Sequence, residues 1–192
     1  MARGTLLQRC LPRPPAPGVD VSPARSAPTL GATLLLAFVA GLIAATVRLS
    51  TVLTGYDSLS VASACLATAI IATLPWRVLR VVLAGSPRLA RGSALRLALI
   101  GVALASGIVG TALYAGYRWL RPGYLTEHYD QYLAAFVAAG HAGEGGLREF
   151  TARRSWFEDP LAQALNSSLL LALAGTVTAL FLVYRRPPRR QE

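Results

Sequence analysis

Four long stretches of this chain carry no charged residue, and this feature limits the folds available to it more than any other. The stretches predict membrane spans at about residues 29–47, 58–76, 97–117 and 160–184, each 19 to 25 residues long. A helix of about 20 residues crosses the roughly 30 Å of hydrocarbon in a bilayer, because each residue adds about 1.5 Å. Hydrophobic residues make up 54% of the chain and charged residues only 15%, which is too apolar for an ordinary soluble domain. We therefore expect an all-α integral membrane bundle of four transmembrane helices.

The arginines predict how these spans are oriented, because cytoplasmic loops next to spans carry an excess of basic residues. All 19 Lys and Arg residues are arginine. The segment before the first span, the link between the second and third spans, and the C-terminal tail are strongly basic. The link after the first span balances one arginine with one aspartate, and residues 118–159 hold five arginines against six acids. This bias places both termini in the cytoplasm, as an even number of spans requires.

The chain is predicted to form a single membrane domain at residues 29–187, with a short tail at each end. Residues 1–28 are rich in proline and arginine and are expected to be a disordered cytoplasmic tail, because repeated prolines prevent helix formation. Residues 188–192 form a second cytoplasmic tail. The first span resembles a signal peptide in its basic prelude, but its apolar run exceeds the usual length of about 7–15 residues, so we interpret it as an uncleaved anchor.

The segment at residues 118–159 is the only sizeable part expected outside the membrane. Apolar residues recur there at helical spacing, at Leu125, Tyr129, Tyr132, Leu133 and Phe136. This spacing predicts an extracytoplasmic amphipathic helix over residues 124–139 that lies on the outer leaflet. Glycines then interrupt the pattern, and a second short helix is expected at 147–157. Asp159 and Pro160 are typical of a helix N-cap and first helical position, and they predict where the fourth span begins.

Small residues at four-residue spacing predict how the spans pack, because such pairs let helix backbones approach closely in lipid. The candidates for helix packing are Gly41, Gly107, Gly110, Gly116 and Gly175. The third span holds most of these glycines, so we expect it to be central and to touch more than one neighbour. Packing within the chain is the favoured interpretation, and the same surfaces could instead serve a homo-oligomer.

The acidic and imidazole groups Glu127, His128 and Asp130 form the one polar cluster outside the membrane that could carry chemistry. The two histidines of the chain lack metal-ligand spacing, and no nucleophile, phosphate-loop or zinc motif occurs, so no cofactor is expected. A solvated helix face is the simpler interpretation.

The predicted spans contain no Asp, Glu, Lys, Arg or His, which argues against proton-coupled transport. The net charge of +10 comes from arginines at span edges, which favours anionic lipid over nucleic acid.

The order of these features resembles a known bacterial family, domain of unknown function 4199. The residues that carry the resemblance lie in the last two spans and the segment between them: Gly107, Tyr117, Pro122, Tyr124, Leu125, Gly175, Arg185 and Arg186. The resemblance covers about residues 29–187, and the proline-rich start departs from the family pattern. It implies a four-span protein of the bacterial inner membrane, without a known activity and without functional residues to transfer.

These observations favour a non-enzymatic component of the membrane, whose partners are the lipid bilayer and a second copy or another membrane protein. One alternative is a small transporter or channel subunit, with hydroxyl groups of the second and fourth spans lining a polar path. Another alternative is an enzyme at the outer membrane surface that uses Glu127, His128 or Asp130.

Overall fold

The computed structural model describes residues 27–55, 57–85, 91–140 and 143–185, and every regular element within these ranges is a helix. The predicted tails at residues 1–28 and 188–192 lie outside the described residues, except for Ala27 and Pro28, which begin the first helix. Proline is tolerated in a first turn because its missing N–H has no partner there in any helix.

Four long helices confirm the predicted all-α membrane fold. They are α1 (Ala27–Thr54), α2 (Asp57–Gly85), α3 (Arg91–Ala115) and α7 (Pro160–Tyr184). Residues 30–54, 60–84, 92–120 and 160–184 are long and apolar enough to cross a membrane. The chain is therefore a multi-pass membrane protein by the length and composition of its helices.

Three of these helices continue beyond the charge-free stretches. α1 ends at Thr54 rather than Val47, α2 ends at Gly85 rather than Trp76, and α3 begins at Arg91 rather than Leu97. Arginine is a good helix former, and its long side chain can carry the charge toward a polar region while the backbone stays helical. The first charge after an apolar run therefore does not end a helix, and Arg48, Arg77 and Arg96 lie inside helices.

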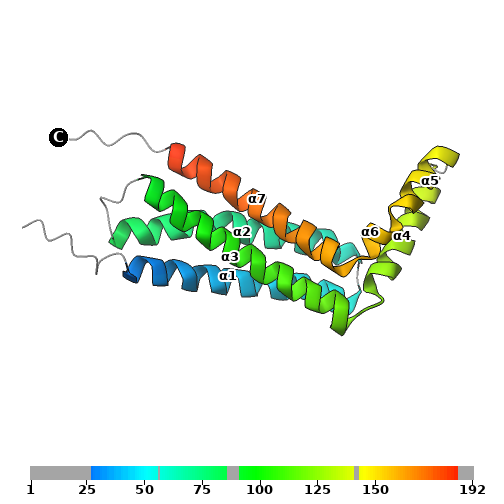
Figure 1. Cartoon of the computed structure of the whole chain (residues 1–192), viewed down its shortest axis with the longest axis horizontal. Coiled ribbons are helices and arrows are strands. Elements are labelled where there is room, and N and C mark those ends of the chain that lie inside the picture. The colour runs from blue at the N-terminus through cyan, green and yellow to red at the C-terminus, as the bar shows by residue number, and fades with distance from the viewer. Residues whose placement is uncertain (1–26, 56, 86–90, 141–142, 186–192) are drawn as a thin grey trace, which may run out of the picture.

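The four long helices pack side by side in alternating directions, so that α1 begins and α7 ends at the same end of the bundle (Figure 1). α2 and α3 contact each other, and each of them also contacts both α1 and α7. α1 and α7 thus lie on opposite sides of the α2–α3 pair. The expectation that the third span is central is confirmed.

Small side chains form much of the bundle core. Fully buried alanines occur on every long helix, at Ala37, Ala44, Ala67, Ala98, Ala105 and Ala179. A β-carbon added at Gly41 would lie 3.1 Å from Ala105 Cα, and one added at Gly175 would lie 2.7 Å from a methyl group of Val102. These helices approach one another too closely for larger residues at those positions.

Between α3 and α7 the chain forms a π turn, η2 (Gly116–Leu120), and three shorter helices, α4 (Tyr124–Ala138), α5 (Glu144–Ala152) and α6 (Arg154–Glu158). We call α4, α5 and α6 the arm. It projects from the end of the bundle opposite the start of α1 and the end of α7, and turns sharply away from the bundle axis (Figure 1). As predicted, Asp159 caps α7 by accepting a hydrogen bond from the Leu161 amide at 2.9 Å, with Pro160 at the start of the helix.

The arm has its own aromatic core, which covers part of the apolar face predicted for α4, whereas Tyr132 of that predicted face is exposed. The ring of Tyr129 lies 5.3 Å from that of Phe150, and the Phe136 ring stacks on Phe150 at 5.1 Å. Tyr129 is buried and Phe157 also contacts it. The amphipathic helix thus forms over the predicted residues, and α5 and α6 cover much of its apolar face.

Candidate functional site

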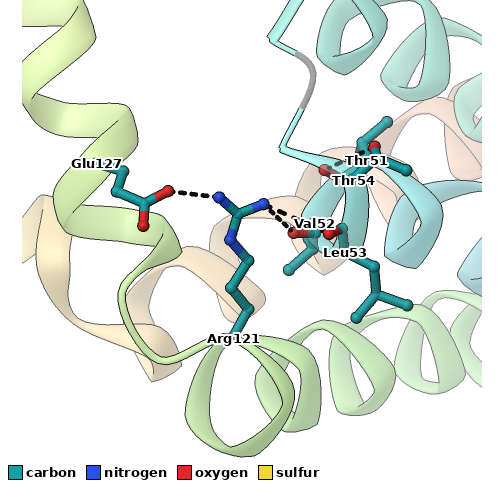
Figure 2. A network of polar contacts seen from close by, with 6 residues as sticks. All are labelled: Thr51, Val52, Leu53, Thr54, Arg121 and Glu127. Carbon is teal, nitrogen blue, oxygen red and sulfur yellow. Dashed lines mark hydrogen bonds and ion pairs between the residues drawn. The ribbon is translucent and has the colours of Figure 1, made fainter.

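The arm joins the bundle through Arg121, which lies in the turn between η2 and α4. Its Nη1 atom donates hydrogen bonds to the carbonyl oxygens of Val52 at 3.2 Å and Leu53 at 3.4 Å. Its Nη2 atom pairs with Glu127 Oε2 at 2.5 Å. Figure 2 shows the guanidinium between the last turn of α1 and the carboxylate on α4. One side chain thus connects three parts of the chain, and we call Arg121 with its partners the latch.

The last turn of α1 is well suited to bind this guanidinium. The final carbonyl groups of a helix have no partner within the helix and carry a partial negative charge. The chain leaves α1 at Gly55, which has a φ of +71° and donates its amide to the Thr51 carbonyl at 2.9 Å. A β-carbon at position 55 would collide with the Arg121 guanidinium. Glycine is therefore required there both by the backbone conformation and by the latch.

The three residues of the predicted polar cluster take part in different interactions. Glu127 belongs to the latch, whereas Asp130 lies 3.8 Å from the Arg154 guanidinium. The His128 ring stacks on Tyr124 with centroids 5.4 Å apart and meets Tyr132 edge-on at 4.7 Å. The structure therefore does not bring these residues together on one reacting point.

Arg154 is the second cation that organises the arm. Its Nε atom donates to Glu158 Oε1 at 2.9 Å, and its guanidinium lies 5.1 Å from the centre of the Tyr129 ring. The hydrogen bond to Glu158, followed by the charge of that carboxylate, raises the pKa of Arg154 above its usual value. Arg154 thus remains cationic at any ordinary pH and connects α6 to α4.

A third polar arrangement lies inside the bundle near the arm. Arg48 on α1 donates from Nη1 to the Ser60 carbonyl at 3.2 Å and to Ser63 Oγ at 3.3 Å. The Ser63 hydroxyl in turn lies 3.5 Å from Thr51 Oγ1, and both of these side chains are buried. Because polar groups in a membrane need partners within the protein, this network ties α1 to α2 close to the latch.

A shallow groove runs along the free face of α4. It has a volume of about 290 Å³ and is lined by His128, Gln131, Tyr132 and Ala135. The Tyr132 side chain is 48% exposed. Unlike Tyr129 and Phe136, which pack against α5 and α6, these residues lie on a face of α4 that the described part of the arm leaves uncovered.

The ionisable side chains of the arm take part in contacts within the chain. Among the described residues no group of three His, Cys, Asp or Glu side chains could hold a metal ion. Glu127 and Asp130 are each paired with an arginine. What these groups do in the structure is hold the arm in a defined position.

Arg121, Arg154 and Arg48 were not singled out from the sequence. Two features of the sequence could have drawn attention to Arg121. Gly55 and the Pro122–Gly123 pair are typical of chain reversals, and Arg121 directly precedes the second of them. No comparable pattern in the sequence indicates which carbonyl or carboxylate each arginine meets.

Comparison with protein-family models, curated proteins and solved structures gives no match to this chain, and the resemblance to domain of unknown function 4199 stays a prediction.

Proposed function

We propose that this chain is a non-enzymatic, multi-pass component of the bacterial inner membrane that binds a protein partner through its arm. Both termini are placed in the cytoplasm and the arm on the extracytoplasmic side, in accord with the arginine bias of the links. The partner would meet the face of α4 that carries Gln131, Tyr132 and Ala135.

One observation carries this proposal: the arm is fixed firmly to the bundle, yet one face of α4 is left open. The latch joins α4 to α1, and Tyr124 and Leu125 in the first turn of α4 are buried against the bundle core. A binding surface that is already ordered loses little conformational entropy when a partner docks. The open face also carries a half-exposed tyrosine, a residue type that is frequent among the strongest contributors to protein interfaces.

The polar contacts at the root of the arm support binding over catalysis. Glu127 and Asp130 each have an arginine partner, and His128 lies between two aromatic rings. A general base must lie within hydrogen-bond reach of the proton that it removes, and these three side chains do not converge on a common point. Because these side chains hold the arm together, a scaffold role for the arm is favoured over catalysis.

The hydroxyl groups of α2 also have local partners, which weighs against the transport alternative. Thr68 donates to the Ala64 carbonyl at 2.8 Å, and Thr73 donates to the Ile70 carbonyl at 3.0 Å. Ser63 belongs to the Arg48 network. Hydroxyls that bond to their own helix do not need to line a wet path.

Photo-crosslinking in cells tests the proposal. A photoreactive amino acid at Gln131 is expected to capture a protein partner, whereas the same group at Thr126, on the opposite face of α4, is expected to capture none. Adding Ala135→Arg should abolish the crosslink, because a long charged side chain would project from the contact face. Thr126→Arg is the matched control and should leave the crosslink intact.

Two results would contradict the proposal. The first is identical crosslinking from Gln131 and Thr126, or none from either site. The second is that the protein purifies in mild detergent only as a monomer with no other protein. Orientation is tested separately by reporter fusions at both termini, where opposite-sided signals would overturn the assignment of the cytoplasmic ends.

A further inference from the structure

A lateral groove lies between α3 and α7, in the half of the bundle nearest the arm. Its volume is about 320 Å³, within the range of small-molecule sites. The lining residues come from both helices: Gly107, Gly110, Thr111, Tyr114, Leu161, Ala164, Leu165 and Ser168. Gly107, Thr111, Leu161 and Leu165 are exposed on the side of the bundle, so the groove opens toward the hydrocarbon of a membrane.

The groove forms because small residues line both α3 and α7. Some lie at its floor, where the two helices touch, and others lie at its open edge. At its floor, a β-carbon added to Gly110 would lie 2.9 Å from Ser168 Cβ, so the two helices touch there. A β-carbon added at Gly107 would meet no atom within 4 Å. The Thr111 hydroxyl donates to the Gly107 carbonyl at 2.9 Å and is therefore already satisfied. Most of the lining is thus apolar, and its length from Gly107 to Tyr114 is about 10 Å at 1.5 Å per residue.

The end of the groove nearest the arm has the features of a membrane–water interface. Tyr114 marks this end, and its ring meets that of Trp119 edge-on at a centroid distance of 6.0 Å. Trp119 is 71% exposed, and tyrosine and tryptophan prefer the level of the lipid headgroups. Arg118 lies one turn beyond Tyr114, is exposed, and forms no ion pair within the described parts of the chain.

We propose that this groove binds one acyl chain of an anionic phospholipid from the leaflet on the arm side, with the phosphate held by Arg118. An acyl chain suits a mostly apolar groove that opens sideways and runs along the helices. A phosphate suits an exposed guanidinium at headgroup level, because planar guanidinium groups bind phosphate oxygens in pairs. In an anionic lipid no choline cation competes for that phosphate, so it should bind Arg118 more strongly than the phosphate of a zwitterionic lipid.

A helix from a second copy is the other occupant that a groove of small residues could accept. A two-fold dimer within one membrane would bring the same surface of each copy together, and therefore the two Arg118 side chains. Arg118 has no ion pair with a described carboxylate of its own chain that would neutralise it, so the two like charges would repel. The charge at the end of the groove thus favours the lipid.

Fluorescence quenching by brominated lipids tests the proposal on the full-length protein. The variant with Trp76→Phe and Trp156→Phe keeps Trp119 as its single tryptophan, next to the end of the groove. We expect brominated anionic phosphatidylglycerol to quench Trp119 more efficiently than brominated phosphatidylcholine in mixed vesicles. An apparent preference of about fivefold is expected, since one arginine near an anionic surface contributes about 1 kcal/mol.

Three variants separate the contact with the acyl chain from the contact with the headgroup. Gly107→Leu should remove the preference by filling the groove, and Thr111→Leu, a second variant of the same wall, should reduce it. Arg118→Gln should bring the anionic and zwitterionic lipids to equal quenching. The matched controls are Gly92→Leu, an open glycine far from the groove on α3, and Arg148→Gln, an exposed arginine of the arm; both should keep the preference.

Equal quenching by the two lipids in the parent protein would overturn the proposal. So would a preference that survives both Gly107→Leu and Thr111→Leu in protein that remains folded by thermal unfolding. A stable dimer in lipid nanodiscs that Gly107→Leu dissociates would assign the groove to a second copy instead.

Discussion

The bundle and the arm each pack their helices around a core, but different residue types fill the two cores. Alanine, valine and glycine fill much of the bundle core, and its helices approach closely at Gly41, Gly110 and Gly175. The arm instead packs four aromatic rings, those of Tyr129, Phe136, Phe150 and Phe157, between three short helices. The two regions adjoin each other, and among the described residues the bundle core includes aromatic rings only where it meets the arm, at Tyr117 and Tyr124.

The difference follows from the solvent of each region. Lipid is as apolar as a leucine side chain, so helices in a membrane gain little from burying large apolar groups and depend on close contact between backbones. The arm lies outside the spans, where removing an aromatic ring from water is strongly favourable. Large rings therefore stabilise the arm, whereas a large residue at Gly41 or Gly175 of the bundle would force its helices apart.

The largest effect is expected from a variant that unfolds the arm and leaves the bundle folded. Tyr129→Ala removes a buried ring and should cost about 3–5 kcal/mol of the arm's stability, because a cavity remains among the other rings. Limited proteolysis and hydrogen exchange should show cleavage and fast exchange in residues 124–158, with the four long helices still protected. If the bundle loses protection together with the arm, the two cores are not independent.

The next prediction compares two glycines of the bundle. Gly175→Leu should lower the free energy of unfolding by about 1–3 kcal/mol or more, because the new side chain would collide with Val102. Gly107→Leu should have little effect, since that position opens outward. Unfolding in detergent with increasing denaturant compares them directly. Equal losses would mean that close approach of the backbones does not determine stability in this bundle.

A third prediction concerns the boundary between the two regions. Arg121→Gln should cost about 1–2 kcal/mol, since it removes charged hydrogen bonds to α1 that are partly screened by solvent. Hydrogen exchange should rise at the end of α1 and the start of α4, while the cores keep their protection. Arg153→Gln is the control, because its pair with Glu149 is well exposed. A larger effect from the control would show that the latch does not join the regions.

The smallest expected effect has the opposite sign. The Tyr129 hydroxyl is buried and has no hydrogen-bond partner among the described residues. Tyr129→Phe keeps the ring and removes an unsatisfied polar group, so it should leave the arm's stability unchanged or raise it by up to about 1 kcal/mol. Exchange rates in the arm measure this change. A clear loss of stability would indicate that a water molecule or another group binds the hydroxyl.

Helix ends could be predicted from the sequence only where local chemistry defines them. The fourth span was predicted at residues 160–184 and α7 has these bounds, because Asp159 caps its start and Pro160 suits its first turn. The first two spans were predicted to end at Val47 and Trp76, directly before Arg48 and Arg77, whereas α1 and α2 continue to Thr54 and Gly85. Those arginines remain helical, and Arg48 finds its partners on α2 rather than in water.

The candidate residues, like the helix ends, could be predicted only in part from the sequence. Spacing alone identified glycines suited to close packing, but spacing does not tell which neighbour each one faces. Gly41 and Gly175 meet other helices, whereas Gly107 faces outward into the lateral groove. Likewise, Glu127, His128 and Asp130 are adjacent in sequence, yet they contact different partners because neighbours on a helix point in different directions.

The sequence by itself determined the four apolar helices, their alternating directions and the helical segment between the last two, because each depends on the polarity of a continuous stretch of chain. Only the tertiary structure decided that Arg121 caps α1 while pairing with Glu127, that Arg48 bridges two helices, and that α5 and α6 cover much of the apolar face of α4. These contacts join residues far apart in the chain. A long side chain can reach many partners, and the packing of the helices selects one.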